Sequence, residues 1–141
     1  MKRNASAQWK GGLKEGSGEL TTESTVLSNT PYSFQTRFES GQGTNPEELI
    51  AAAHAGCFSM ACAAELGQKG LRADFIHTTA TVELAKQEDG FAIAAIHLDV
   101  HAKLPDADSI EFENAANHAK KNCPVSKLMN ADITMELTLE I

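Results

Sequence analysis

The sequence predicts an α+β fold built as one domain of 141 residues. Two segments, 46–66 and 105–122, have the start signals and the apolar spacing of helices. Alternating or β-branched segments, which are typical of strands, stand before, between and after these helices. This order favours antiparallel sheet that covers two helices. With 42% hydrophobic residues and no internal repeat or linker, the chain has the apolar content of a single core.

The first forty residues favour β structure. Trp9 stands just before a glycine turn, and residues 21–27 are rich in β-branched side chains. From 32 to 38 the residues alternate in character, which predicts a strand. That strand would carry Phe34 and Phe38 on one face and Arg37 on the other.

The helix at 46–66 has the clearest start in the chain. Asn45 is a preferred cap, Pro46 suits the first helical position, and Glu47 and Glu48 lie at the positive end of the helix dipole. Seven of the eighteen residues from 49 to 66 are alanine. A helix that is apolar nearly all round in a soluble chain is central and buried. We therefore expect a core helix and not a membrane span, which needs about 20 predominantly apolar residues.

The second half of the chain predicts a hairpin, a helix and a last strand. Segments 78–84 and 91–104 are the hairpin strands, and the second carries His97, Asp99 and His101 on its polar face. The helix at 105–122 opens at Pro105 with Asp106, Ala107 and Asp108. A short helical turn at 125–128 and an alternating strand at 133–141 complete the order.

Charge and cysteine content exclude several classes of function. A net charge of −7 repels a nucleic-acid backbone or an anionic membrane, so neither is expected as a partner. No apolar segment follows Lys2 and Arg3, so we expect no secretory leader. Three sparse cysteines differ from the dense, even sets of small secreted domains. A reducing cytoplasm is the expected compartment.

The three cysteines differ in position. Cys57 lies in the middle of the first helix, where a small core residue is the commoner explanation. Cys62 is five residues further on, about 140° around an ideal helix, and belongs to the core. Cys123 precedes Pro124 at a helix boundary, where unpaired N–H groups favour a thiolate. Position alone leaves its role open.

Two other groupings are possible sites. His54 lies three residues before Cys57, which is suitable for a Cys/His nucleophile pair of a hydrolase. His97, Asp99 and His101 alternate along one strand face and offer three metal ligands, although a solvated sheet face explains them equally well.

Several motifs together resemble the OsmC/Ohr family of thiol peroxidases over essentially the whole length. They are Arg37, the helix start at 44–49, the helix segment AAAHAGCF at 51–58, and NCPVS at 122–126. The spacing of Arg37 and Glu47 and the long N-terminal β region are more similar to the osmotically inducible OsmC branch. The resemblance implies an OsmC-like fold, with antiparallel β-sheets wrapping two central helices in an intertwined homodimer with sites at the subunit interface.

The resemblance also implies an activity and its residues. The chain would reduce organic hydroperoxides, with Cys57 as the peroxidatic thiol, Cys123 as the resolving thiol, and Arg37 and Glu47 as the supporting pair. The reductant would be an external dithiol, of lipoyl type, and neither cofactor nor metal is expected. A permanently charged guanidinium would lower the pKa of Cys57, and Glu47 would hold that guanidinium in place. Oxidation would give a sulfenic acid and then a disulfide with Cys123.

Two further expectations concern the surroundings of Cys57. In a straight helix, Glu47 and Cys57 are about 15 Å apart along the axis, so we expect Arg37 and Glu47 to complete the site of a partner chain. A pocket for the organic part of the substrate would be lined by Phe34, Phe38, Phe58 and Met60, although such side chains are as often plain core. The remaining alternative is a stress-induced binding protein with inert cysteines.

Overall fold

The computed structural model describes residues 1–105 and 107–141. They form two compact units, Met1–Leu49 and Ile50–Ile141, each of which is described by itself. The elements confirm an α+β fold in the predicted order, with one additional short helix near the end of the first unit.

The first unit contains a three-stranded antiparallel sheet in the order β1-β2-β3. Its strands are β1 (Ala5–Lys10), β2 (Ser17–Thr22) and β3 (Thr30–Tyr32). The rings of Trp9 and Tyr32 meet across this sheet with their centroids 5.4 Å apart. Gly18 lies beneath both rings, where any Cβ would overlap the Tyr32 side chain. The predicted N-terminal hairpin is therefore confirmed, with an aromatic pair over a glycine.

The strand predicted at 32–38 is wrong, because most of that segment forms helix α1 (Phe34–Phe38). Ser33 caps this helix: its hydroxyl accepts a hydrogen bond from the Thr36 N–H, and the Thr36 hydroxyl accepts one from the Ser33 N–H. This reciprocal capping box satisfies two backbone donors at once. Local side-chain bonds to the backbone thus override the alternating pattern. Arg37 consequently lies in the last turn of a helix.

Helix α2 (Pro46–Gln68) begins at the predicted residue and extends two residues beyond the expected end. Its buried side chains recur every fourth residue, which places them in one narrow stripe. They are His54, Phe58, Cys62 and Leu66. By length and composition the helix could cross a membrane, a property that the core helices of soluble proteins share. Only 22% of its most apolar 18-residue window is buried within the chain. The complete burial expected of it is therefore not reached within one chain.

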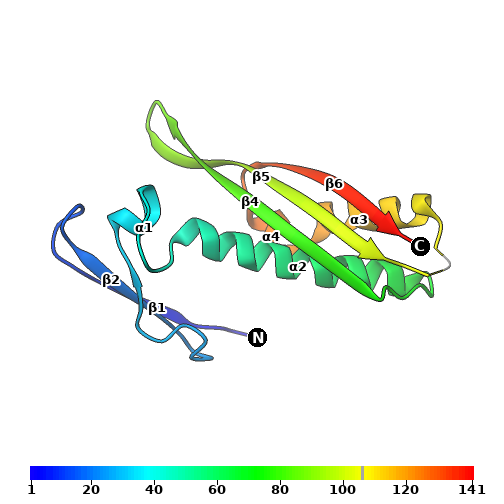
Figure 1. The fold of residues 1–141 in the computed structure, drawn as a ribbon, viewed down its shortest axis with the longest axis horizontal. Coiled ribbons are helices and arrows are strands. Elements are labelled where there is room, and N and C mark those ends of the chain that lie inside the picture. The colour runs from blue at the N-terminus through cyan, green and yellow to red at the C-terminus, as the bar shows by residue number, and fades with distance from the viewer. Residues whose placement is uncertain (106) are drawn as a thin grey trace. The chain divides into compact units, whose positions relative to one another are not determined.

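The second unit is built on a three-stranded sheet in the order β4-β5-β6 (Figure 1). Its strands are β4 (Phe75–Gln87), β5 (Gly90–Lys103) and β6 (Asp132–Glu140). β4 and β5 form the predicted antiparallel hairpin, but β6 lies parallel to β5. A wholly antiparallel sheet is therefore wrong here. The helical crossover between β5 and β6 returns the chain to the end where β5 began, which makes the pairing parallel.

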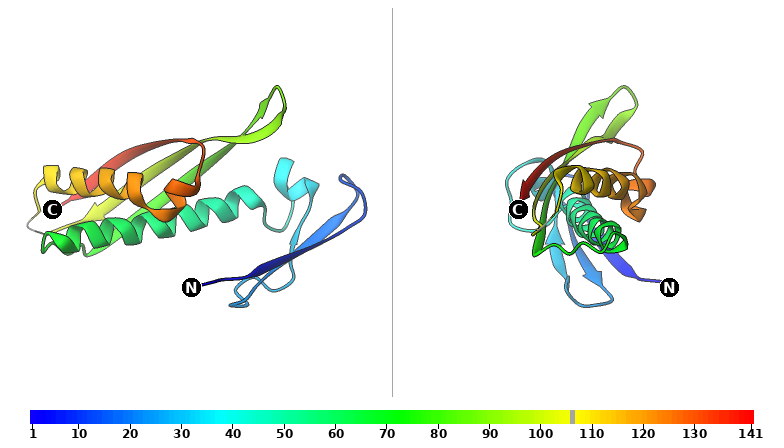
Figure 2. Two further views of the ribbon diagram at one scale, coloured as in Figure 1. Left: turned by 180° about the vertical axis from the view of Figure 1, so that it is seen from behind. Right: turned by 90° about the vertical axis from the view of Figure 1, so that its right-hand side faces the viewer.

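The crossover consists of helices α3 (Ser109–Asn122) and α4 (Pro124–Leu128). Asp108 caps α3 by accepting a hydrogen bond from the Ile110 N–H at 2.8 Å, so the helix starts later than predicted. Of the expected opening residues, Asp106 lies outside the described part of the chain. In Figure 2, α2 and α3 lie on the same side of the sheet. The His118 Nδ1 of α3 lies 2.8 Å from the Glu65 Oε1 of α2.

The core of this unit lies between the sheet and the two helices. β5 contributes its apolar face, as the alternation predicts, and α3 contributes Phe112 and a row of alanines. The buried β5 side chains are Ile96, Leu98, Val100 and Ala102. The opposite face of the sheet is polar. This packing fixes α2 and the start of α4 within the same unit, and these two elements carry the cysteines considered next.

Candidate active site

Cys57 and Cys123 meet in the second unit, although 66 residues separate them in the sequence. Their Sγ atoms lie 2.7 Å apart in a hydrogen-bonding contact, and both cysteines are free thiols. Cys57 comes from the middle of α2, and Cys123 is the residue that ends α3 and caps α4. Cys57 is partly exposed, whereas Cys123 is fully buried. The two thiols are therefore close enough to be joined by a small movement, and Cys57 is the one that solvent reaches.

The pKa of each thiol depends on the other thiol. Burial opposes a charge on Cys123, but the contact with Cys57, the Ser126 hydroxyl and the N–H groups of Val125 and Ser126 outweigh it and lower the pKa of Cys123. For Cys57, burial and the neighbouring Cys123 raise the pKa. Of the two thiols, Cys123 is thus the one whose surroundings favour the ionised form. The favourable position predicted for Cys123 is supported, whereas the pKa of Cys57 is raised and not lowered in this unit, where no cation among the described residues acts on it.

His54 is a fully buried residue of α2 and bonds to Ser126, not to Cys57. Its Nε2 lies 2.8 Å from the Ser126 Oγ, and its Nδ1 has no partner among the described residues. Burial lowers the pKa of His54, so the ring is neutral. The Cys/His pair suggested by the sequence is therefore not formed. Ser126 was not predicted to have a role; the signal that points to it is its place three residues after Cys123, in the first turn of α4.

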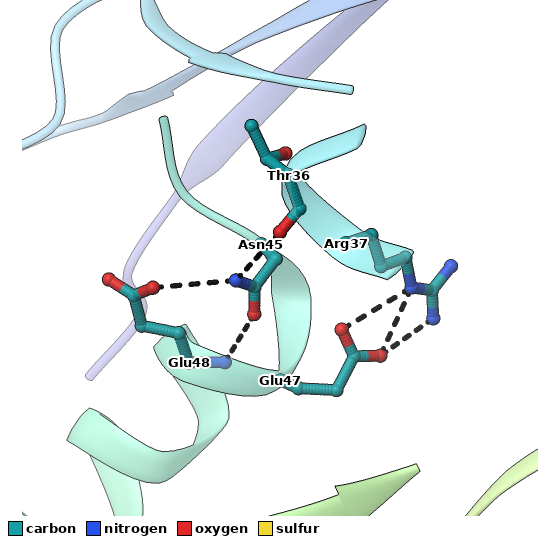
Figure 3. A network of polar contacts seen from close by, with 5 residues as sticks. All are labelled: Thr36, Arg37, Asn45, Glu47 and Glu48. Atoms are coloured by element: carbon teal, nitrogen blue, oxygen red, sulfur yellow. Dashed lines mark hydrogen bonds and ion pairs between the residues drawn. The ribbon is translucent and has the colours of Figure 1, made fainter. Parts of the chain in front are cut away.

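Arg37 and Glu47 pair in the first unit, as predicted. The Arg37 Nη2 donates to the Glu47 Oε1 at 2.7 Å, and its Nε donates to both carboxylate oxygens at 3.1 and 3.3 Å (Figure 3). The Arg37 side chain is 39% exposed and the Glu47 side chain only 13%. Such a fork holds the guanidinium in one orientation. The Phe38 ring lies beside the Arg37 guanidinium, with 5.3 Å from Cζ to its centroid.

The neighbouring Glu48 has a different partner, Asn45. The Glu48 N–H donates to the Asn45 Oδ1 at 2.8 Å, and the Asn45 Nδ2 reaches the Glu48 carboxylate at 3.4 Å (Figure 3). The same Nδ2 donates to the Thr36 carbonyl. Asn45 therefore caps α2 and ties its start to α1, which carries Arg37.

The four residues expected to line a substrate pocket are divided between the two units, which are described separately. Phe34 and Phe38 pack on each other in the first unit, with centroids 4.8 Å apart. Phe58 is wholly buried in the core of the second unit, which agrees with the alternative of a plain core residue, and its place in a pocket wall stays a prediction. Met60 is 77% exposed and borders an open hollow beside Leu71 and Ile76.

The remaining candidates have structural explanations. Cys62 is fully buried in the core, as expected. His97 bonds the Thr134 hydroxyl at 2.7 Å, and His101 bonds the Glu140 carboxylate at 2.6 Å across the sheet. Among the residues that the structure describes, no group of three or more His, Cys, Asp or Glu side chains is suited to a metal ion. The strand face is therefore accounted for by pairing with β6.

Sequence comparisons were made against families and known proteins. A family described as OsmC-like protein matches residues 39–138. The chain is 46% identical over 138 residues to Peroxiredoxin OsmC of Escherichia coli strain K12, covering 98% of this chain and 96% of that protein. It is 31% identical over 100 residues to an Organic hydroperoxide resistance protein of Xanthomonas axonopodis pv. citri, covering 70% and 68% of the two chains.

Solved structures share the fold. The Organic Hydroperoxide Resistance Protein OhrB of Bacillus subtilis superimposes with a TM-score of 0.72 at 27% identity, covering 96% of this chain and 98% of that chain. An OsmC-like protein from Mycoplasma pneumoniae superimposes with a TM-score of 0.77 at 16% identity, covering 100% and 99%. At the latter identity the likeness concerns the fold alone.

Proposed function

Because this chain belongs to the OsmC-like family, whose related proteins include a peroxiredoxin and organic hydroperoxide resistance proteins, we propose that it is a cysteine-based peroxidase that reduces organic hydroperoxides. A peroxidase role in stress defence follows from these relatives. The observation that carries the finer proposal is the 2.7 Å contact between the Sγ atoms of Cys57 and Cys123. Two free thiols this close are suited to a cycle that passes through a disulfide.

The proposed reaction has three steps. The Cys57 thiolate attacks the outer oxygen of the hydroperoxide; the O–O bond breaks, and the alkoxide takes a proton and leaves as the alcohol. Cys123 then attacks the Cys57 sulfenic acid, so that an S–S bond forms and water leaves. An external dithiol, which we propose is of lipoyl type, exchanges with this disulfide and restores both thiols. No resident cofactor or metal is proposed.

Exposure supports Cys57 as the thiol that meets the peroxide. Its side chain is partly accessible, whereas Cys123 has no exposed surface. Because the pKa of Cys57 is raised in the unit by burial and by Cys123, a cation must be added to favour a thiolate there. Arg37, which Glu47 holds by a two-pronged ion pair, is the proposed source.

We propose that this cation comes from a second copy of the chain. Along the continuous helix α2, ten residues separate Glu47 from Cys57, which is about 15 Å of rise and more than a direct contact spans. An isologous dimer that pairs α2 antiparallel with its mate brings the start of one helix towards the middle of the other. The exposed apolar surface of α2 supports such a dimer, since only 22% of its apolar window is buried within one chain.

Mass spectrometry after one equivalent of cumene hydroperoxide tests the chemistry. The proposal requires a disulfide between residues 57 and 123 and one equivalent of alcohol. Cys57→Ser should abolish turnover, and Cys123→Ser should leave a sulfenic acid at Cys57 that dimedone traps. Cys62→Ala is the matched control, because Cys62 is a core residue and the disulfide should still form. Three persistent free thiols would favour a binding protein with inert cysteines.

Mixed dimers test the sharing of the site. A chain with Arg37→Ala and a chain with Cys57→Ser each lack one required residue, so either homodimer should be inactive. Their heterodimer should recover one working site, about half of the wild-type activity per dimer. Activity no higher than that of the two parents would contradict sharing across the interface.

Substrate class and compartment complete the proposal. If apolar side chains such as Met60 contact the substrate, kcat/KM should be higher for cumene hydroperoxide than for hydrogen peroxide. Equal values would argue against an apolar pocket. We propose a cytoplasmic location, because the cycle needs thiols that start reduced and a dithiol donor.

A further inference from the structure

The first turn of α4, which Cys123 caps, contains one member of a buried polar pair that the proposed peroxide chemistry does not use. The pair consists of His54 from α2, with no exposed surface, and Ser126 from α4, which is 7% exposed. The His54 Nε2 and the Ser126 Oγ are 2.8 Å apart. Polar groups are costly to bury unless they are bonded to each other. A histidine at this place in an apolar stripe, with Phe58, Cys62 and Leu66 as its neighbours, therefore calls for an explanation beyond packing.

The bonding of the ring restricts where its proton lies. His54 Nδ1 has no partner among the described residues, and burial keeps the ring neutral by lowering its pKa. If Nε2 carries the hydrogen, it donates to the Ser126 oxygen and leaves the hydroxyl hydrogen free for another acceptor. If Nδ1 carries the hydrogen instead, this buried N–H has no acceptor among the described residues, and the Ser126 hydroxyl donates its hydrogen to Nε2. The first arrangement leaves only a lone pair unpartnered.

The free hydroxyl hydrogen has an acceptor within the same helical turn. Cys123 is the cap residue of α4, Ser126 is the third residue of that helix, and the Ser126 hydroxyl favours the ionised form of the Cys123 sulfur. A thiolate is a far better acceptor than a neutral thiol, so a negative charge on Cys123 favours the tautomer with hydrogen on Nε2. In this arrangement the imidazole donates to the hydroxyl, and the hydroxyl donates to the sulfur that reacts.

We propose that His54 and Ser126 are positioning residues for Cys123: the imidazole donates to the hydroxyl, the hydroxyl donates to the sulfur, and this donor chain holds Cys123 ready to close the disulfide with Cys57. The last clause rests on the proposed function, whereas the donor chain does not. In the closing step the Cys123 electron pair forms the S–S bond, the S–O bond of the Cys57 sulfenic acid breaks, and hydroxide leaves as water with a proton from solvent. His54 and Ser126 keep their own hydrogens throughout.

A pH titration of Cys123 tests the donor chain without any peroxide. Because Cys123 is fully buried, its thiolate is followed by ultraviolet absorbance and not by a labelling reagent, in a Cys57→Ser and Cys62→Ala background from pH 5 to 10. Loss of a hydrogen bond to a charged sulfur reduces the thiolate fraction about tenfold. Ser126→Ala should therefore reduce the thiolate fraction about tenfold at pH 7 and displace the pH profile upwards, while Ser126→Thr keeps the hydroxyl and the wild-type profile.

The histidine is tested by a pair of variants that differ in donor capacity. His54→Leu removes the N–H and should displace the profile in the same direction, whereas His54→Gln retains an N–H of similar reach and should restore it. Ser59→Ala is the matched control, because Ser59 lies on the same helix and loses a hydroxyl bond of the same length, to Thr78 at 2.8 Å. It should leave the profile unchanged. Profiles of Ser126→Ala and His54→Leu equal to the wild type, or an equal displacement in Ser59→Ala, would overturn the proposal.

A second measurement separates this inference from the proposed function. With one equivalent of cumene hydroperoxide, Ser126→Ala in the otherwise native chain should oxidise Cys57 at the wild-type rate. It should close the 57–123 disulfide about tenfold more slowly, so that a dimedone adduct accumulates at Cys57. Displaced titration profiles with no oxidation of the wild type would refute the peroxidase and keep the donor chain. Normal closure in the variant would refute the role in resolution.

Discussion

Met60→Glu is the sharpest test of the assembly that the proposed site needs. Met60 is 77% exposed in the single chain, in the middle of the uncovered side of α2. Within one chain, glutamate at this position is a solvated charge on a helix, so the free energy of unfolding of the isolated chain should change by no more than about 0.5 kcal/mol. If α2 packs on its mate, the same substitution removes an apolar contact and buries a charge.

The magnitude follows from the symmetry. Burying a methionine side chain contributes about 1.5–3 kcal/mol, and an isologous interface contains the position twice, which gives about 3–6 kcal/mol per dimer. At about 1.4 kcal/mol for each factor of ten, the dissociation constant should rise by at least about 10²-fold. Desolvation of the two carboxylates adds to this effect. Sedimentation equilibrium from 0.1 to 100 μM measures the change directly.

Two controls make the result specific. Met60→Leu conserves volume and apolar character, so the dimer should persist. Ile110→Glu places the same charge on another exposed apolar residue, 63% accessible in the first turn of α3, where an acid is favoured by the helix dipole. A Met60→Glu protein with an unchanged dissociation constant, or a wild-type chain that is monomeric at 100 μM, would refute the packing of α2 on a second copy.

Three further predictions concern the single chain. Burial, and then the charge of Glu65, raises the pKa of Cys62 from its ordinary value of 9.0 to about 11. Because the thiol ionises at lower pH in the unfolded chain, the free energy of unfolding should fall as the pH rises from 9 to 11. Urea titrations of Cys62→Ala should lack this contribution. An equal fall in the variant would contradict the assignment. Phe112→Ala should cost about 3–5 kcal/mol of unfolding free energy, because the ring is 2% exposed, whereas Ile110→Ala should cost less than about 0.5 kcal/mol. Gly18→Ala should destabilise the first unit, because its Cβ would overlap the Tyr32 ring, and a thermal unfolding midpoint equal to the wild type would contradict that contact.

Several features of the fold were predictable from the sequence because they depend on residues close together in the chain. The start of α2 follows from Asn45, Pro46 and two acids, and the buried face of β5 follows from strict alternation. The pairing of Arg37 with Glu47 was expected from the resemblance, and the structure places it at 2.7 Å.

Other features depended on which local signal prevails or on how the chain crosses over. Residues 34–38 alternate like a strand, but the capping box of Ser33 and Thr36 forms a helix there. Likewise, the parallel direction of β6 follows from the crossover through α3 and α4, which no pattern within 133–141 contains.

By itself, the sequence determined the class of fold and the element order, because side-chain period and capping chemistry are properties of neighbouring residues. It also identified Cys57, Cys123, Arg37 and Glu47 as candidate site residues, through the motifs that carry the resemblance. Only the tertiary structure decided the distances and the hydrogen bonds at the thiols. It placed the Cys57 Sγ 2.7 Å from the Cys123 Sγ, buried Cys123 while leaving Cys57 partly exposed, and paired His54 with Ser126 instead of with a cysteine. The physical reason is that contacts between distant segments depend on how the helices pack on the sheet, and that packing sets burial, hydrogen bonding and therefore the ionisation of each thiol.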